Sequence, residues 1–148
     1  MNKKREAREF CFQYFFHIQL PVFEELKSGL NDDDLKKSIN EFKESTNTLL
    51  ADELNHFAFS LIGGTLKNYS LLEEKIEKYL KNWKLSRISK VDHTILLLSA
   101  YELLFNKDTP VTIVINEAIE ISKKFGSVDS GPFVNGVLDN LSKNELNG

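Results

Sequence analysis

The segment from Ser86 to Phe105 constrains the fold most, because the helix that it predicts is apolar on nearly every face. A helix at a protein surface has one apolar stripe, whereas a helix that is apolar all round has to be covered on several sides. We therefore expect this helix to be buried and surrounded by other parts of the chain. The residues that form the pattern are Ile88, Val91, Ile95, Leu96, Leu97, Leu98, Ala100 and Leu103.

Helical spacing of apolar residues also dominates the rest of the chain, and no convincing strand alternation interrupts it. We predict further helices over about Lys3 to Gln19 with an end at Pro21, after the Asn31–Asp34 cluster, around Leu54 to Thr65, from near Ser70, and twice after Thr109. The stripe of the second helix contains Leu35, Ile39, Phe42 and Leu49, and that of the fourth contains Leu72, Ile76, Tyr79, Leu80 and Trp83.

Length and composition predict one compact domain. A chain of 148 residues with 41% hydrophobic and 11% aromatic residues can bury a single core. The content of 7 Gly and 3 Pro is low for the many tight turns of an all-β fold. We expect an all-α bundle of about seven helices over residues 1–148. A soft boundary near Tyr69–Ser70 would divide it into helical subdomains of about 1–69 and 70–148.

The sequence predicts a cytoplasmic protein with no membrane partner. No apolar run approaches the roughly 20 residues that a membrane span requires. The charged N-terminus continues directly into an amphipathic helix, without the apolar region of a secretory signal. A net charge of −3 and a pI near 5.7 exclude a globally basic nucleic-acid-binding protein, although they leave room for a local basic patch.

Such a patch is predicted at the start of the first helix, where Lys3, Lys4, Arg5 and Arg8 accompany a single carboxylate, Glu6. Cations at a helix N-terminus oppose the helix dipole, which costs some tenths of a kcal/mol. This local cost favours a functional use of the cations.

The same helix carries a mixed stripe of cations and aromatic rings beside its core stripe. A helical projection places Arg5, Arg8, Phe12 and Phe16 along one line. Arginines that contact phosphates beside rings that stack on bases are typical of surfaces for single-stranded nucleic acid. The alternative is that Phe12 and Phe16 pack against a second layer and the cations only interact with solvent.

The segment from Thr109 to Asn140 predicts two short helices joined by a tight turn over Gly126 to Pro132. Thr109 is expected to be the N-cap of the first of these helices, with Pro110 at its first helical position. Asp129 and Ser130 are expected to cap the second helix, although Asp129 could instead accept a hydrogen bond from a base.

Phe133 is the second candidate for contact with nucleic acid. It follows the turn directly and lies at the edge of its helix's core stripe. The first turn of a helix has free backbone N–H groups, which can bind a phosphate or another anion.

No catalytic or metal-binding arrangement is evident. Cys11 lies on an apolar face, where a small core residue is more common than a nucleophile. The histidines lack ligand spacing, and the Asp32–Asp34 run lacks the glycine and the distal glutamate of a calcium-binding loop. We therefore expect no enzymatic activity, no metal and no cofactor. The histidines are His17, His56 and His93.

Two further features have structural interpretations. Glu102 lies inside the apolar pattern of the 86–105 helix, so its carboxylate needs a partner, for which Arg8 or Arg87 is suitable. Gly63-Gly64 lies within a helical pattern and does not match a phosphate-binding loop, so close helix packing is the expected role.

Four segments, in this order, resemble the bacterial NusB family of transcription antitermination factors. The resemblance covers nearly the full chain, and the last segment is the most specific. The segments are Arg5–Glu9 (REARE), Trp83–Ile88 (WKLSRI), Val91–Leu103 (VDHTILLLSAYEL) and Ile115–Asp139, with INEAIEISKKFG followed by FVNGVLD.

The resemblance implies a NusB-like helical fold without enzymatic activity. Family members bind the boxA element of single-stranded leader RNA from ribosomal RNA operons, together with the ribosomal protein NusE. The complex then joins the RNA polymerase elongation complex with other Nus factors and promotes antitermination. A homodimer is a possible state of the free protein.

The resemblance also implies roles for individual residues. Lys4, Arg5 and Arg8 correspond to the basic start, which contacts phosphates, and Lys3 adjoins them. Phe133 matches the family's stacking aromatic residue, and Asp129 matches the acidic residue beside it. The predicted RNA-binding set is Lys3, Lys4, Arg5, Arg8, Phe16, Asp129 and Phe133, and the predicted partner-binding residues are Asp92 and Tyr101.

Two positions depart from the family pattern. Glu6 interrupts the basic run where some members have another arginine, and Leu97 occupies a position where arginine is frequent. Both departures predict weaker direct affinity for RNA and a greater dependence on the partner protein.

Two other functions remain open from the sequence. The chain could be a helical adaptor that binds proteins without recognising RNA, with a basic N-terminus that only aids solubility. The same fold also forms an accessory domain of some ribosomal RNA methyltransferases. Since the sequence contains no glycine-rich cofactor-binding segment, methyl transfer by this chain itself is not expected.

Overall fold

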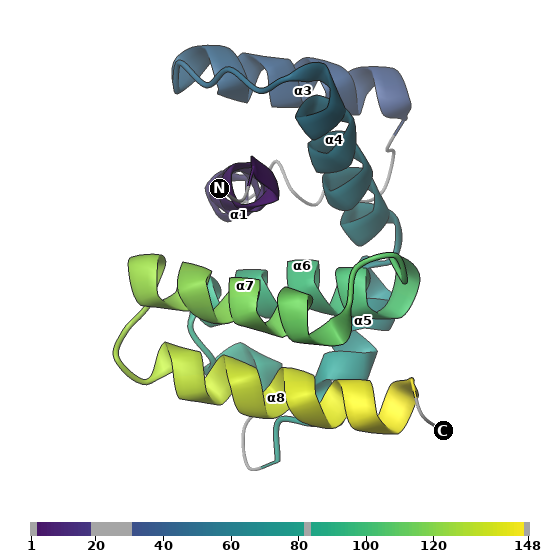
Figure 1. Ribbon diagram of the computed structural model, residues 1–148, viewed down its shortest axis with the longest axis vertical. Helices are drawn as coiled ribbons and strands as arrows, with labels where there is room; N and C mark the ends of the chain where they lie inside the picture. The colour runs from purple at the N-terminus through teal and green to yellow at the C-terminus, as the bar shows by residue number, and fades with distance from the viewer. Residues whose placement is uncertain (1–2, 19–30, 82–83, 147–148) are drawn as a thin grey trace. The chain divides into compact units, whose positions relative to one another are not determined.

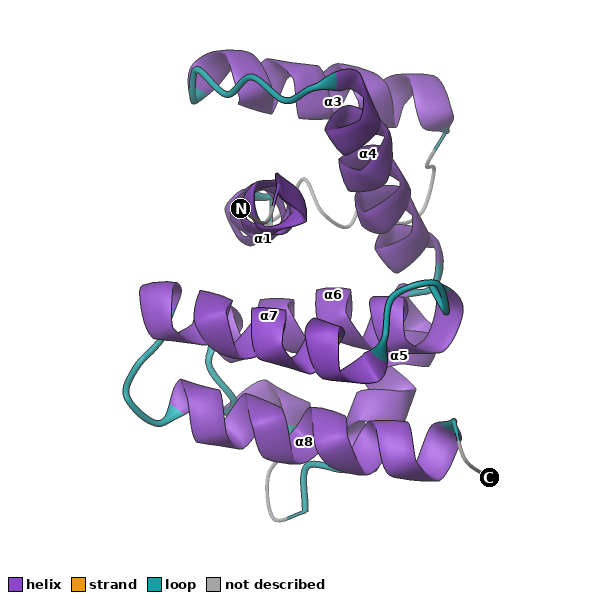
Figure 2. Cartoon of the chain, in the orientation of Figure 1, coloured by secondary structure: helices purple, strands orange, loops and turns teal. Residues whose placement is uncertain are grey.

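The computed structural model describes residues 3–18, 31–81 and 84–146, and all regular structure in these ranges is helical (Figure 2). This confirms the predicted all-α fold class. The elements in chain order are α1 (Lys3–His17), α3 (Asp32–Ser45), α4 (Asp52–Lys67), α5 (Tyr69–Glu77), the short 3-10 helix η1 (Leu85–Arg87), α6 (Lys90–Phe105), α7 (Val111–Phe125) and α8 (Ser130–Glu145), as Figure 1 shows.

The chain divides into two compact units, an N-terminal unit of Met1–Lys67 and a C-terminal unit of Asn68–Gly148. The N-terminal unit contains α1, α3 and α4, and the C-terminal unit contains α5 to α8. The division falls just before the Tyr69–Ser70 boundary expected from the sequence.

Aromatic side chains of α1 and α3 pack together in the N-terminal unit. The ring centroids of Phe10 and Tyr14 each lie 5.6 Å from that of Phe42. The Tyr14 hydroxyl and Ser38 Oγ are 2.7 Å apart, and burial raises the pKa of Tyr14. These contacts place α3 against one side of α1, and α4 packs against α1 as well.

Small residues bring α4 close to its neighbours. The Cys11 thiol of α1 is buried and donates to the Ala58 carbonyl of α4, 3.6 Å away, which confirms its prediction as a core residue. At Gly63, an added Cβ would lie 3.3 Å from Leu35 Cδ2 of α3. The close packing predicted for the Gly63-Gly64 pair is therefore confirmed at Gly63.

The prediction that Leu49 belongs to the stripe of α3 is wrong. The helix begins within the acidic cluster, where Asn31 Oδ1 accepts from the Asp34 N–H at 2.8 Å, and it ends at Ser45. Asn47 adopts a φ of 52°, and the Thr48 N–H donates to the Lys43 carbonyl at 2.9 Å. This is a Schellman-type C-cap, in which asparagine takes the left-handed position. Leu49 lies beyond it and is 96% exposed.

The buried central helix is α6. All residues from Thr94 to Ala100 are buried, as are Glu102 and Leu103, and α6 packs against α5, α7 and α8. Its predicted start at Ser86 is wrong, because Leu85–Arg87 forms the separate turn η1 and Ile88 is extended. The α-helix begins at Lys90, where Ser89 Oγ accepts from the Asp92 N–H at 3.1 Å.

Two other predicted boundaries differ by a short distance. Pro110, and not Thr109, occupies the N-cap position of α7. Helix α5 ends at Glu77, so Tyr79 and Leu80 lie in the connection that follows it, where Leu80 is nevertheless buried. Trp83 and Pro21 lie outside the described residues.

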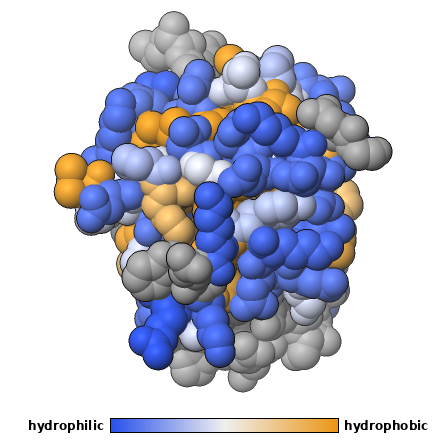
Figure 3. All heavy atoms as spheres, turned by 90° about the horizontal axis from the view of Figure 1, so that it is seen from below, coloured by the Kyte–Doolittle hydropathy of each residue, from blue (hydrophilic) through white to orange (hydrophobic). Residues whose placement is uncertain are grey.

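The surface in the view of Figure 3 is mainly hydrophilic, with smaller apolar groups between the polar ones. Exposed large apolar side chains occur in both units, among them Phe16 and Leu49 in the N-terminal unit and Leu71, Phe105, Ile113 and Val128 in the C-terminal unit. Scattered apolar residues are usual on protein surfaces, so functional surfaces have to be identified from their geometry.

Candidate nucleic-acid interface

The start of α1 places two cations over one aromatic ring. Lys4 Nζ and Arg8 Cζ each lie 5.2 Å from the ring centroid of Phe57 on α4. Lys4 and Arg8 share a helix face because they are four residues apart. Cation–π contacts contribute about 0.5–2 kcal/mol depending on burial. Phe57 therefore attaches the basic end of α1 to α4, a role that the sequence analysis did not identify.

The predicted cations differ in exposure. Lys4 is exposed and Arg5 is half-buried, whereas Arg8 is only 5% exposed. The side chain of Lys3 lies outside the description. A phosphate can approach Lys4 and Arg5 directly, while Arg8 is a packed residue that holds Phe57.

Of the two aromatic residues in the predicted mixed stripe of α1, one is a core residue and the other is a surface residue. Phe12 is 3% exposed, so the packing interpretation is correct for it, whereas Phe16 is 42% exposed. Their rings stack with centroids 5.9 Å apart at an angle of 20°. Phe16 thus presents an aromatic surface supported from beneath by Phe12.

A close contact at Gly126 forms the turn between α7 and α8. A Cβ added there would lie 2.5 Å from Ser130 Oγ and 2.9 Å from the Ser122 carbonyl oxygen, so no larger residue fits without a shift. Ser130 is buried, and its Oγ accepts from the Ser127 N–H at 3.1 Å. The hydroxyl of Ser130 therefore closes the turn from within the first turn of α8.

Asp129 occupies the N-cap position of α8, but its side chain makes no capping hydrogen bond. The prediction of Asp129 as the N-cap residue is therefore confirmed for its position but not for its carboxylate, and Ser130 is the first residue of the helix instead of its cap. The Asp129 side chain is exposed at the start of the helix. A carboxylate in this position can accept a hydrogen bond from a ligand.

The anion site predicted from free N–H groups is smaller than expected. The Ser130 N–H donates to the Ser127 carbonyl at 3.1 Å, and the Phe133 N–H donates to the Asp129 carbonyl at 3.2 Å. Pro132 carries no N–H. The first turn of α8 therefore contributes mainly side chains to any ligand contact.

Phe133 is half-buried and lines a pocket of about 260 Å³ within the C-terminal unit, which we call the Phe133 pocket. An added Cβ at Gly136 would meet nothing within 4 Å, so this part of the α8 surface is open. The pocket combines aromatic surface with one cation and one amide. Its other lining residues are Tyr79, Leu80, Lys81, Pro132, Val137 and Asn140.

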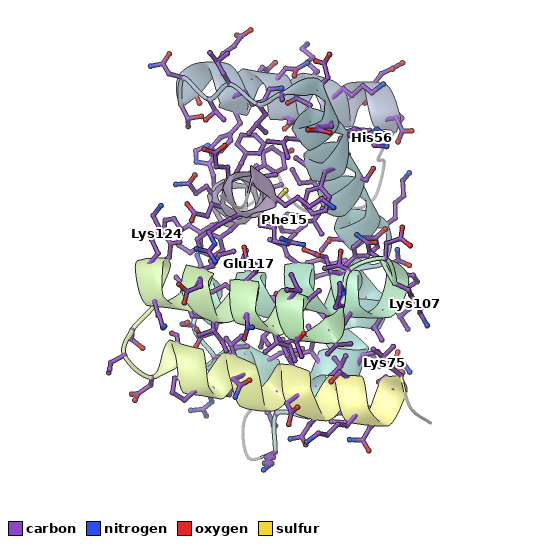
Figure 4. All side chains as sticks on the ribbon, in the orientation of Figure 1. Phe15, His56, Lys75, Lys107, Glu117 and Lys124 are labelled. Atoms are coloured by element: carbon purple, nitrogen blue, oxygen red, sulfur yellow. The ribbon has the colours of Figure 1, made fainter. Side chains whose placement is uncertain are left out.

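A charged network holds one wall of the Phe133 pocket. The Tyr79 hydroxyl donates to Glu145 Oε2, and Lys75 Nζ is 2.8 Å from Glu145 Oε1 (Lys75 is labelled in Figure 4). Hydrogen bonds from Lys75 and Tyr79 hold the pKa of Glu145 below its ordinary value. The sequence analysis missed Tyr79, Lys81 and Asn140, because it treated Tyr79 as part of the α5 stripe.

The residues predicted to bind a partner both lie on α6 and are half-buried. Asp92 Oδ1 is buried and, among the described residues, has no hydrogen-bond partner. The Tyr101 ring stacks on Phe105 with centroids 5.2 Å apart, and Phe105 is exposed.

Glu102 is buried as predicted, and its pairing with Arg8 or Arg87 stays a prediction.

Within the described part of the chain there is no candidate metal site and no membrane-spanning helix, and His93 pairs with a carboxylate. No group of three or more His, Cys, Asp or Glu side chains there could hold a metal ion. His93 Nε2 lies 3.1 Å from Glu73 Oε2, and burial lowers the pKa of His93 while the carboxylate opposes this shift. No helix among these residues is long and apolar enough to cross a membrane.

Comparison with known proteins identifies the fold and the family. A family model described as the NusB family matches residues 5–143. The chain belongs to the NusB family. The resemblance found in the sequence is thereby confirmed, and the family is one of transcription antitermination factors, which are not a known class of enzymes.

The similarity to individual NusB proteins extends over nearly the whole chain. The transcription antitermination protein NusB of Elusimicrobium minutum is 44% identical over 149 residues, which cover 100% of this chain and 99% of that protein. The structure of T. maritima NusB matches with a TM-score of 0.78 at 36% identity, covering 95% of this chain and 91% of that one.

A third relative is known from a crystal structure of the antitermination factors NusB and NusE in complex with dsRNA. It matches with a TM-score of 0.77 at 24% identity and covers 97% of this chain and 98% of that one. This match shows a common fold.

Proposed function

We propose that this NusB-family protein binds boxA-type single-stranded leader RNA of ribosomal RNA operons together with the ribosomal protein NusE. The complex joins the RNA polymerase elongation complex with other Nus factors and promotes antitermination. The match to the NusB family over residues 5–143 is the observation that carries this role. The relative that was crystallised with NusE and dsRNA supports both kinds of partner.

The proposal assigns RNA contacts to residues of each unit. Lys3, Lys4 and Arg5 contact phosphates, and Arg8 holds the basic end of α1 through Phe57. Phe16 and Phe133 offer rings on which bases stack, and the exposed Asp129 accepts a hydrogen bond from a base. Because the chain is acidic and only three cations contact phosphates in this proposal, its own affinity for RNA is modest and tight binding requires the partner.

The surface for NusE includes Asp92 and Tyr101 on α6. A buried carboxylate oxygen without a donor is costly, and Asp92 Oδ1 is such an atom within the described residues. A donor from the partner would remove this cost. The stacked Tyr101 and Phe105 rings add aromatic area to the same helix.

A fluorescence titration with labelled boxA-like RNA, with and without NusE, tests the RNA-binding part of the proposal. Three phosphate contacts on a single strand give a log–log salt slope of roughly −2. The double variant K4A/R5A should weaken binding to all RNA sequences and flatten this slope. The F133A variant should lose about 1–3 kcal/mol of stacking.

Three results would overturn the RNA site or its details. Unchanged titrations in K4A/R5A and in F133A would exclude the proposed surface. Binding of NusE without any RNA binding would favour the helical adaptor. Tighter binding of a double-stranded form of the same RNA would exclude recognition of the single strand.

A separate experiment tests the steps after RNA binding. In an in vitro transcription reaction with a boxA-containing template, the protein should increase read-through of a terminator when NusE is present. Size-exclusion chromatography of the free protein tests for the homodimer. The D92N variant should weaken NusE binding and leave binding of RNA alone unchanged.

A further inference from the structure

A second pocket, of about 290 Å³, lies between α3 and α4 of the N-terminal unit, and we call it the lysine groove. None of its lining residues belongs to the RNA-binding set proposed above. Phe10, Ile39, Ala58 and Phe59 give it an apolar floor. The polar residues that line it are Lys36, Asn40, Lys43, Asn55 and His56, the last of which Figure 4 labels on α4.

The charge of the lysine groove is opposite to that of the whole protein. The chain has 22 Asp and Glu residues and a net charge of −3, yet no carboxylate residue lines the groove. Lys36 Nζ lies 5.4 Å from the Phe59 ring centroid, and Lys43 Nζ donates to Asn55 Oδ1 at 2.6 Å. Within the described ranges, neither lysine forms an ion pair with a carboxylate.

The spacing of the two lysines limits the shape of a ligand. Lys36, Asn40 and Lys43 share one face of α3, and Lys36 and Lys43 are separated by roughly 10 Å along the helix axis. In an extended peptide, at about 3.3 Å per residue, the side chains two positions before and two positions after a large apolar residue lie on the same face as that residue and about 13 Å apart, a span that two flexible lysine side chains can match. The apolar side chain between them would then lie over Ile39 and Ala58.

The floor of the groove favours a protein ligand over a nucleic acid. Phe10 is buried, and Lys36 lies over the ring of Phe59, so neither ring is free as a stacking platform. Sequence-tolerant binding of single strands depends on such platforms. An aliphatic or aromatic side chain needs only an apolar cavity, and the two asparagine amides can hydrogen-bond to a peptide backbone.

We propose that the lysine groove binds an acidic segment of a partner protein. One large apolar side chain of that segment fills the groove, and carboxylates on either side of it pair with Lys36 and Lys43. The groove is thus an interaction surface of the N-terminal unit in addition to the surfaces for RNA and NusE.

The test is an NMR titration of the 15N-labelled full chain with the synthetic peptide Asp-Glu-Asp-Phe-Glu-Asp-Glu. Saturable shift changes should be confined to amides of α3 and α4 around the groove. The same peptide with Gly in place of Phe should bind roughly tenfold more weakly, because it cannot bury a ring. A Lys-for-Asp/Glu version of the peptide should not bind.

Charge-reversal variants locate the site on α3. K36E should weaken the peptide roughly tenfold through repulsion of its carboxylates. K37E is the matched control, because Lys37 is also exposed on α3 but does not line the groove. H56E, at an exposed position on α4, should weaken the peptide too. Neither lysine position is buried, so circular dichroism should show unchanged folding.

Specific outcomes would overturn the proposal. These are the absence of saturable shifts at the groove, equal affinity for the Phe and Gly peptides, or equal effects of K36E and K37E. Oligouridine that shifts the same amides at lower concentration than the peptide would instead assign the groove to RNA. The boxA titration of the previous section is independent, because K36E leaves the proposed RNA residues intact.

Discussion

The basic end of α1 and the hairpin of α7 and α8 position their candidate RNA-binding residues in different ways. At α1, long flexible cations are held by the face of one ring, since Lys4 and Arg8 share Phe57. At the hairpin, Phe133 follows a turn whose atoms approach so closely that only glycine fits at position 126. The first region can adapt to a ligand, whereas the second is preorganised.

This difference leads to different expected costs of substitution. The contact between the exposed Lys4 and the ring contributes little and leaves room for adjustment, although Arg8 is buried against the same ring. Forcing extra atoms into a close-packed turn requires backbone movement. The experiments below test whether the hairpin is in fact the rigid region and α1 the adaptable one.

The largest effect is expected for G126A. The new methyl group would meet Ser130 Oγ at 2.5 Å and the Ser122 carbonyl oxygen at 2.9 Å, so the turn has to move. We expect a loss of about 2–3 kcal/mol in the free energy of unfolding, measured by urea denaturation. G136A is the matched control, because its methyl group would meet nothing within 4 Å, and it should be neutral or stabilising. Equal stabilities of G126A and G136A would contradict a rigid turn.

A smaller effect is expected for F57L at α1. Leucine preserves the apolar packing but removes the ring face that lies beneath Lys4 and Arg8. The free energy of unfolding should fall by about 1 kcal/mol. F57L should also lower RNA affinity less than K4A/R5A does, because the cations remain. If F57L abolished RNA binding, the basic end of α1 would be as strictly positioned as the hairpin.

The smallest effect is a pH dependence at the wall of the Phe133 pocket. Lys75 and Tyr79 lower the pKa of Glu145 from its ordinary value of 4.5. A carboxyl group with a lowered pKa stabilises the fold above that ordinary value, and this contribution disappears as the pH falls through the lowered pKa. Wild type should therefore melt above E145Q at neutral pH, and the two melting curves should converge below pH 4.5.

D139N is a suitable control for this pH series. Asp139 pairs with Lys143 one turn away, 2.9 Å apart, at an exposed site on the same helix. Exposed pairs of this kind contribute little to stability, so D139N should follow the wild-type profile. A difference between wild type and E145Q that does not change with pH would show that the carboxylate charge is not what holds Tyr79.

The sequence predicted helix positions well where they depend on local spacing. The periodic stripes located the helices, and the all-apolar pattern identified α6 as the buried one. Boundaries were missed where capping competes with periodicity. Asn47 ends α3 before Leu49, and Ser89 starts α6 after a separate 3-10 turn. Both signals are present in the sequence, but many asparagines and serines do not cap helices.

The candidate sites were less predictable, because neighbours along one stripe have different environments. Phe12 and Phe16 are one helical turn apart, yet the first is buried and the second exposed. The difference depends on which helices cover each position, and periodicity does not contain that information. Tyr79 and Phe133 are distant in sequence and line one pocket for the same reason.

The sequence alone determined the helical fold class, the burial of α6 and membership of the NusB family, because all three follow from residue patterns along the chain. Only the tertiary structure decided that Phe57 holds the basic cations, that Ser130 closes the hairpin turn, and that Lys36 and Lys43 flank an apolar groove. The first and third features are contacts between segments that are distant in the chain, and the second is a contact within a tight turn. Their geometry exists only after the helices have packed.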